Sequence, residues 1–413
     1  MYVLKKFSFS ILLYLSLIIG YFYNENLNFG AYQDWLNANI NPLIDFSNNF
    51  IDTFLNYEKY GHRHSPVYLI FLSLILKTGI DIEYLRLLHL HFCLILVLLF
   101  YKCLRIKFSN IDSKLLLLLS LTIFLSPTFR SLSIWPESRI PGLIFFTLSI
   151  FYLLKFEKNS EIKFVWYSTL SLIVSAYISP NFSVFIVYFF YFFLKKIKIS
   201  DLKYLIFFAF LSSLPMFYYL FILDVNFLTA GGTQYTEERG LYHFNLSNKI
   251  LIISSIFLFH FIPFIGNLLN IKDLKNFTKN QFFIFFIFFV ILIFFFDYGS
   301  EFTGGGVFFQ LSNFLFANNY LFYFISFFSI FLFFIISKKE YSNFLLITLI
   351  ILSNVQNSIY HKYYEPMFMI LIFTLFKNFE FNKFFSKKSN FYILYLFCFC
   401  FIFLRVIKNH YLI

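Results

Sequence analysis

The chain has 413 residues, of which 60% are hydrophobic and only 13% are charged, and its net charge is +12. Water-soluble domains ordinarily carry about a quarter charged residues, so this composition excludes an ordinary soluble enzyme. Apolar runs of roughly 15 to 20 residues recur along the whole chain and end at Lys, Asn, Gly or Pro. This pattern predicts an all-α fold, a polytopic transmembrane bundle of about 13 helices.

The positive charge has two possible explanations, nucleic-acid binding or position relative to a membrane. The basic residues are spread over many short loops and form no single stripe, which disfavours a nucleic-acid partner. Lys and Arg concentrated in the loops on one side of a membrane would account for the same charge. We therefore expect membrane lipids, and no nucleic acid, among the partners.

The first apolar run extends from Phe7 to Tyr23, directly after Lys5 and Lys6, and no small-residue cleavage site follows it. These features predict a retained first helix whose N-terminus is cytoplasmic. The longest polar stretch of the chain, Asn24 to His64, would then lie outside.

The segment from Ser65 to Gly79 is ambiguous, because fifteen residues is short for a membrane span. If it does not cross, the later spans begin near Leu87, Leu115, Ile140, Phe164, Asn181, Tyr204, Ile250, Gln281, Leu321, Asn343, Met367 and Phe391. The cytoplasmic side then holds 22 of the 33 basic residues, whereas a crossing segment would leave 11 of them inside. The positive-inside rule therefore favours juxtamembrane helices within a large first outer loop, residues 24–86.

The outer side contains the acidic and glycine-containing segments. Besides the first loop, they are residues 130–139, 224–249, 297–320 and 360–366. The chain has no dinucleotide-binding fingerprint, phosphate-binding P-loop, zinc-protease HExxH motif or nucleophile elbow. No nucleotide is therefore expected as a cofactor.

Several short motifs follow one another in the first part of the chain. They are His64, Ser65, Pro66, Val67, Tyr68 and Leu69, then Gly79, Glu83 and Arg86, then Ser126 to Arg130, and then Glu137. In this order the motifs resemble those of the integral-membrane GT-C glycosyltransferases, a superfamily that includes protein O-mannosyltransferases and aminoarabinose transferases. The resemblance covers roughly the first 200 residues, with a weaker echo at His361 to Pro366. Ser65 departs from the family pattern, which usually has Pro there.

The resemblance implies a GT-C-like bundle in which residues 1–200 form the catalytic transmembrane module and residues 201–413 add C-terminal helices. It also implies an inverting enzyme of the bacterial inner membrane with a periplasmic active site. Its donor would be a polyprenyl-phosphate-linked sugar, and its acceptor a glycan, a lipid or a protein.

Two acids are the predicted catalytic residues. Asp34 follows the first helix by about ten residues, where the family places its first acid, and it is the expected base for the attacking hydroxyl. Glu137 stands in a short loop beside Trp135 and Arg139, which would present its carboxylate in a defined place. Both carboxylates should face one outer cavity. The alternatives are a solvated carboxylate for Asp34 and, for Glu137, an ion pair with Arg139 or Arg130.

The phosphate of the donor requires positive charge, and Arg63, Arg139 and Lys362 are the predicted ligands. His62 and His64 flank Arg63 and are candidates for binding a metal or the substrate, so a divalent cation is possible. The alternative for these residues is an interfacial position in which long side chains extend toward the head groups.

Two other classes of membrane protein remain open. A lipid-linked sugar flippase or other transporter would place ionisable residues inside its helices and would contain broken helices. An O-antigen polymerase or ligase would rely on outer-loop Arg residues, for which Arg130, Arg139 and Arg239 are available. The acids gather in the outer loops, and this favours chemistry at the membrane surface.

Overall fold

The computed structural model describes residues 2–60, 65–222, 245–269, 278–299, 304–354 and 358–411. Within these ranges the chain forms helices and connecting loops, without a β-strand, so the all-helical prediction is confirmed. The chain divides into two compact units. The first unit contains residues 1–234 and 395–413, and the second contains residues 235–394. Each unit is described by itself below.

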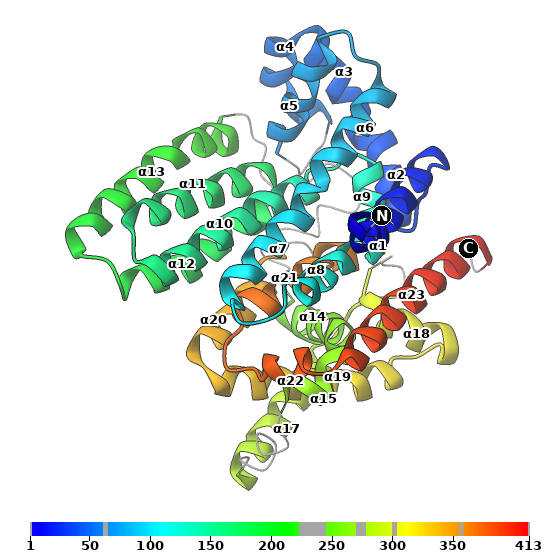
Figure 1. Ribbon diagram of the computed structural model, residues 1–413, viewed down its shortest axis with the longest axis vertical. Coiled ribbons are helices and arrows are strands. Elements are labelled where there is room, and N and C mark those ends of the chain that lie inside the picture. The colour runs from blue at the N-terminus through cyan, green and yellow to red at the C-terminus, as the bar shows by residue number, and fades with distance from the viewer. Residues whose placement is uncertain are drawn as a thin grey trace. The chain divides into compact units, whose positions relative to one another are not determined.

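The helices of the first unit are shown in Figure 1. In chain order they are α1 (Tyr2–Phe22), α2 (Phe29–Asp34), η1 (Trp35–Asn39), α3 (Ile40–Asn48), α4 (Phe50–Leu55), η2 (Tyr57–Tyr60), α5 (Val67–Leu76), α6 (Ile82–Cys93), α7 (Ile95–Lys107), α8 (Ser113–Leu121), η3 (Thr122–Leu125), α9 (Pro127–Ile134), α10 (Arg139–Asn159), α11 (Ile162–Ile178), η4 (Pro180–Phe185), α12 (Ile186–Leu194) and α13 (Ile199–Phe221). Helices α10 to α13 pack side by side.

The second unit continues the helical pattern. Its helices are α14 (Leu246–Phe261), η6 (Ile262–Phe264), α15 (Ile265–Leu268), α17 (Lys279–Phe294), α18 (Gly306–Phe316), α19 (Tyr320–Lys339), α20 (Tyr341–Leu352), η7 (His361–Tyr363), α21 (Met367–Thr374) and α22 (Phe381–Phe385). The last helix, α23 (Lys388–Tyr411), begins in this unit and ends in the first.

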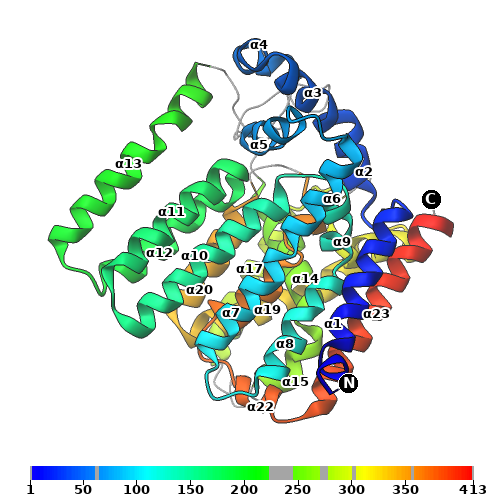
Figure 2. The same ribbon diagram turned by 45° about the horizontal axis from the view of Figure 1, so that its top comes forward.

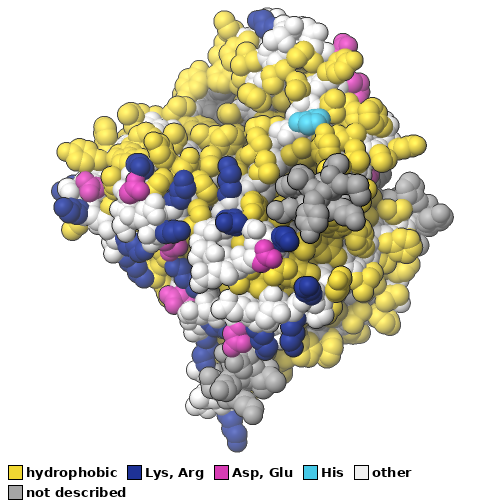
Figure 3. Space-filling view, viewed as in Figure 1, with side chains coloured by type: hydrophobic (Ala, Val, Ile, Leu, Met, Phe, Trp, Pro, Cys, Tyr) yellow, Lys and Arg dark blue, Asp and Glu magenta, His cyan; other side chains and the backbone are white. Residues whose placement is uncertain are grey.

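Among the described residues, six helices are long and apolar enough to cross a membrane. They are Ile82–Lys107, Arg139–Asn159, Ile199–Tyr218, Leu246–Leu268, Tyr320–Lys339 and Lys388–Asn409. The outward face of α13 exposes Phe207, Phe210 and Leu211, and hydrophobic side chains cover much of the face drawn in Figure 3. The chain is therefore a multi-pass membrane protein, while the count of 13 spans stays a prediction.

A seventh candidate span is the bent pair Ser113–Leu125 and Pro127–Ile134, whose parts meet at 65°. Ser126 breaks the helix and caps the next one, since its hydroxyl accepts from the Phe129 N–H at 3.0 Å. Proline at the first helical position then lacks only an N–H that would have no partner inside the helix. As a result, residues up to Ile134 are helical, and the loop that the sequence placed at residues 130–139 shortens to 135–138.

The first outer loop contains short helices, as expected. Helix α5 has ten residues and is about 15 Å long, about half the thickness of a bilayer core. Its Leu69 joins Phe46 and Tyr57 in a small hydrophobic core. The helix is therefore too short to cross a bilayer core by itself, and that it lies at the membrane surface stays a prediction.

Helices α1 and α23 lie side by side and run in the same direction (Figure 2). The rings of Phe9 and Tyr395, both early in the two helices, are 5.3 Å apart. At the other end the Asn409 side chain donates to the Asn26 carbonyl at 2.8 Å. Parallel first and last helices are what an odd number of spans requires, and the side on which each end lies stays a prediction.

Candidate functional site

The turn between α9 and α10 holds the predicted acid Glu137. Its side chain is buried, with an exposed fraction of 6%. Arg139 is the first residue of α10 and is also buried, and its guanidinium carbon lies 5.0 Å from the centre of the Phe182 ring. The turn therefore places a carboxylate and a guanidinium two residues apart inside the protein.

The segment that carries Asp34 packs against this turn. The Tyr32 ring lies 4.6 Å from the Trp135 ring, and the Asn39 amide donates to the Pro136 carbonyl at 3.2 Å. Asp34 is the last residue of α2 and is half-buried. The fold thus brings together two segments that are about a hundred residues apart in sequence. That both carboxylates face one cavity stays a prediction.

Other acids of the first outer loop have local structural roles. The Tyr60 hydroxyl donates to the Asp45 carboxylate, and burial together with this carboxylate raises the pKa of Tyr60. The Asp52 carboxylate accepts from the Asn56 amide at 2.9 Å. These contacts hold α3, α4 and η2 in place, so Asp45 and Asp52 serve the structure of the loop and are not candidates for the catalytic base.

A buried ion pair connects the end of α1 to α9. Arg130 donates to both carboxylate oxygens of Glu25 at 2.6 Å, and it also donates to the hydroxyl and carbonyl of Ser16. A side chain at Gly20 would come within 2.6 Å of the Glu25 carboxylate, so the small residue makes room for the pair. Trp135 donates to the Glu25 carbonyl at 3.1 Å and thereby joins the turn to the same network.

This pairing corrects one alternative drawn from the sequence. Arg130 was a possible partner of Glu137, but its guanidinium is engaged by Glu25 and Ser16. The sequence reasoning overlooked Glu25 because many acids follow the first helix. The available signal was the pair of small residues, Ser16 and Gly20, which stand four positions apart and so share one face of α1.

Arg86, part of the family-like motif after Gly79, supports the turn from another side. Its guanidinium carbon lies 3.8 Å from the centre of the Trp135 ring. It also donates to the Glu83 carboxylate at 2.8 Å and to the Asn24 side chain at 3.0 Å. Arg86 is thus a positioning residue for Trp135, which precedes Glu137 by two positions.

Tyr68 of the juxtamembrane motif has a comparable structural role. Its hydroxyl hydrogen bonds with the His89 Nδ1 atom, and the His89 Nε2 atom donates to the Leu132 carbonyl at 2.8 Å. All three residues are buried. The motif therefore ties α5 to α6 and α9.

In the second unit, α20 and α21 are too short to span a bilayer alone. They have 12 and 8 residues, which corresponds to about 18 and 12 Å against a core of about 30 Å. Asn343, near the start of α20, is bonded to Lys377, which follows the end of α21. Its side-chain amide donates to the Lys377 carbonyl at 3.0 Å and accepts from the Lys377 N–H at 2.9 Å. The start of α20 and the end of α21 are consequently neighbours.

The described part of the connection between α20 and α21 is polar and buried. Lys362, a predicted phosphate ligand, has an exposed fraction of 7% and lies 5.9 Å from the ring centres of Tyr360 and Tyr363. Lys249 of α14 is buried as well and donates to the Asn354 carbonyl. Tyr363 and Tyr364 are buried too.

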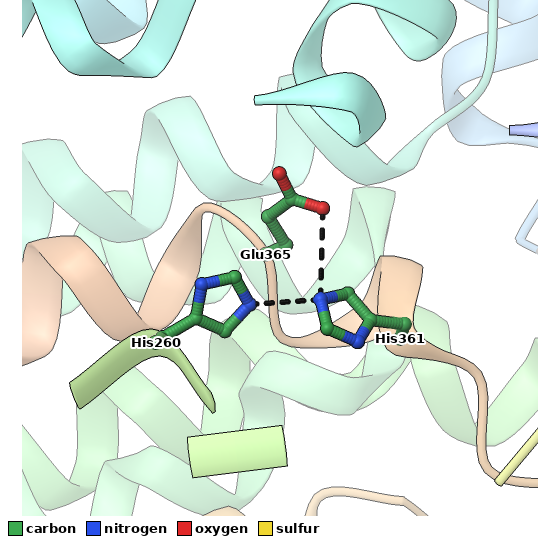
Figure 4. Close-up of side chains that lie close together, drawn as sticks. All are labelled: His260, His361 and Glu365. Carbon is green, nitrogen blue, oxygen red and sulfur yellow. Dashed lines mark hydrogen bonds and ion pairs between the residues drawn. The ribbon is translucent and has the colours of Figure 1, made fainter. Parts of the chain in front are cut away.

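The same connection brings three potential metal ligands together (Figure 4). The Nε2 atoms of His260 and His361 are 2.9 Å apart, and the His361 Nε2 atom lies 3.8 Å from the Glu365 carboxylate. Glu365 and His361 are buried, and His260 is half-buried. The sequence reasoning missed His260 because it stands alone in an apolar run, and nothing in the run indicates its partners.

Three of the predicted site residues, His62, Arg63 and His64, lie outside the described residues, as does Arg239. No family model matches the chain, and no curated protein or solved structure matches it either.

Proposed function

We propose that the protein is a membrane glycosyltransferase of the GT-C type, which transfers a sugar from a polyprenyl-phosphate-linked donor to an acceptor on the periplasmic face. One observation supports it most: the segment that carries Asp34 packs on the turn that carries Glu137 through Tyr32, Trp135 and Asn39. An inverting transfer needs a carboxylate and a cation held together at a membrane surface, and these residues are the candidates.

In the proposed reaction, the acceptor hydroxyl attacks the anomeric carbon and loses its proton to Asp34. The bond from this carbon to the donor oxygen breaks, and the electron pair leaves with the polyprenyl phosphate. Arg139 stabilises the negative charge on the departing phosphate through charge-assisted hydrogen bonds. Glu137, two residues before Arg139 in the same turn, orients the sugar or the acceptor. Arg63 and Lys362 stay predicted phosphate ligands.

The contacts around the turn support such a role physically. A reacting group has to be held close to its productive position, since a misplacement of about 1 Å can cost about 100-fold in rate. Trp135 contacts Tyr32, Arg86 and the Glu25 carbonyl, so its neighbour Glu137 sits on a well-anchored backbone.

A flippase for lipid-linked sugars is the second candidate, and an observation in the second unit favours it. Helices α20 and α21 are short and are joined by a connection that contains the buried residues Lys362 and Glu365. Buried ionisable residues within a helical membrane protein are typical of transport sites.

Transfer of radiolabelled sugar from polyprenyl-phosphate donors tests the proposal, with membranes that carry matched amounts of each variant. Asp34→Asn should lower transfer by about 100- to 10,000-fold, which is the usual contribution of a general base. Glu137→Gln should lower it by about 100-fold, the cost of a misplaced reacting group. Glu58→Gln is the matched control, because Glu58 is an exposed acid of the same outer loop.

Transfer that survives in both variants would remove the catalytic assignment. Wild-type membranes that are inert with every donor, while liposomes containing the protein equilibrate lipid-linked sugar between leaflets, would favour the flippase.

A further inference from the structure

The second unit contains a cluster of side chains that the proposed glycosyl transfer does not use. His260 comes from α14, His361 from η7, and Glu365 from the residues just before α21. Each residue offers one ligand atom, and these three atoms all lie within 4.8 Å of one another. Figure 4 shows the two imidazole rings and the carboxylate converging on one region.

We infer that His260, His361 and Glu365 bind a divalent transition-metal ion, for which Zn²⁺ is the best match. Two imidazoles and one carboxylate form a ligand set that Zn²⁺ uses in proteins, with a fourth position left for water or another ligand. Mg²⁺ and Ca²⁺ prefer oxygen ligands, so a site with two nitrogen ligands disfavours them.

The distances are close to those of a tetrahedral centre. Bonds of about 2.0–2.1 Å to zinc place neighbouring ligand atoms about 3.3 Å apart. The His260 to His361 distance is 2.9 Å and the His361 to Glu365 distance is 3.8 Å, on either side of this value. All three ligand atoms lie within 4.8 Å of one another, so the side chains would draw closer together when an ion binds.

The surroundings favour an ion as well. The Glu365 carboxylate is buried beside His361, and a divalent cation would add a positive charge next to it. The rings of Phe259 and Phe368 pack beside the two imidazoles and keep the local environment apolar.

The position in the chain gives the ion a structural consequence. His260 is 101 residues away from His361, so a bound ion would link α14 to the connection between α20 and α21. His361 and Glu365 are four residues apart, at the beginning and just past the end of one short helical turn. The inference stands on these contacts alone and holds whether the protein transfers or transports lipid-linked sugars.

Metal analysis of the purified protein tests the site. The full chain, purified in detergent through a tag without histidine and dialysed after exposure to Zn²⁺, should retain about one zinc ion per chain. Replacing zinc with Co²⁺ should give the intense visible absorption of a tetrahedral site. This second measurement needs no variant, so it does not depend on how well a substituted chain folds.

Substitutions then locate the ion. His260→Gln, His361→Gln and Glu365→Gln should each weaken zinc binding by more than about 100-fold, since even the loss of an outer-shell partner costs about 10- to 100-fold. His91→Gln should keep the ion, because His91 contacts Tyr14 and the Leu87 carbonyl instead. The double variant His62→Gln/His64→Gln should keep it too.

Three results would overturn the inference: a wild-type protein that retains no zinc, zinc content unchanged in all three cluster variants, or loss of zinc in the His62/His64 double variant alone. The last result would move the metal to the histidine pair flanking Arg63. Sugar transfer is a separate readout, so the failure of the metal site and the failure of the proposed function are distinguishable.

Discussion

The two units of the molecule bury their charged residues in different ways. In the first unit, Arg130 contacts Glu25, which is 105 residues away in sequence, and Arg86 contacts Glu83 of its own helix. Both networks reach Trp135. In the second unit, Lys249 donates to a backbone carbonyl, and His260 of α14 meets His361 and Glu365 from the segment before α21.

The two arrangements suit different tasks, since one holds the backbone in place and the other is suited to bind a ligand. An arginine that holds a carboxylate bidentately stabilises one arrangement of the backbone, since both groups have their partners within the fold. In the second unit, His361 contacts both His260 and Glu365, and these three side chains form a ligand set that suits a metal ion. The charged pairs of the first unit therefore position the acids Asp34 and Glu137, whereas the cluster of the second unit is itself suited to bind an ion.

The largest effect on stability is expected from Arg130→Met. The substitution leaves the Glu25 carboxylate without its bidentate partner, and breaking a buried pair costs about 3–5 kcal/mol. The lower end is expected, because the Glu25 side chain keeps an exposed fraction of 21%. The temperature at which the buried thiols of Cys93 and Cys103 become reactive measures the loss.

This measurement requires a background in which Cys398 and Cys400 are replaced by Ala, since those thiols are less buried. Arg105→Met is the control, because Arg105 is exposed. Adding Glu25→Gln to the Arg130→Met chain should restore part of the stability. Equal reactivity temperatures for the two single variants would show that the pair does not organise the first unit.

A smaller effect is expected in the second unit from Asn343→Leu. The Asn343 side chain is buried and bonds the Ile336 carbonyl and both backbone groups of Lys377. Leaving such groups without partners costs about 1–3 kcal/mol, so amide exchange in α20 and α21 should accelerate roughly 5- to 150-fold.

The control on the same helix is Thr348→Val, since the Thr348 hydroxyl bonds only the Phe344 carbonyl of its own helix. Hydrogen–deuterium exchange in detergent reads both variants, with α10 as an internal reference. If Asn343→Leu changes exchange no more than Thr348→Val does, packing alone holds the start of α20 against the end of α21.

The smallest effect is expected at the surface ion pair between Lys163 and Glu161. The two groups are 2.5 Å apart, but both are exposed. Water and salt screen such pairs, so Lys163→Met should leave thermal unfolding unchanged within error at any salt concentration. A clear loss of stability would mean that a short distance between the two groups, without burial, is enough for a charged pair to stabilise this protein.

Some positions of the fold could be predicted because they depend on local pattern. The starts expected at Ile140 and Phe164 fall within two residues of the first residues of α10 and α11. The interruption at Ser126 and Pro127 is also visible in the sequence, as a capping residue followed by a proline. The continuation of helix to Ile134 was not predicted, because it depends on contacts between distant parts of the chain. Arg130 donates to Glu25, and the Asn28 N–H donates to the Ser131 hydroxyl.

The candidate sites were less accessible from the sequence for the same reason. Asp34 could be singled out by its distance from the first helix, where the family places its first acid, and Glu137 by its short loop between two apolar runs. The contact between their segments through Tyr32 and Trp135 could not be foreseen. Lys362 stood out in a polar segment, but its burial depends on the short lengths of α20 and α21.

The sequence alone determined that this protein is helical and lies in a membrane, since both properties follow from the spacing and length of apolar runs, which each segment carries by itself. Only the tertiary structure decided which charges pair and which converge. Glu25 meets Arg130, and His260 meets His361, across about a hundred residues of chain. Such meetings depend on how whole helices pack, and helix packing is set by many side chains at once.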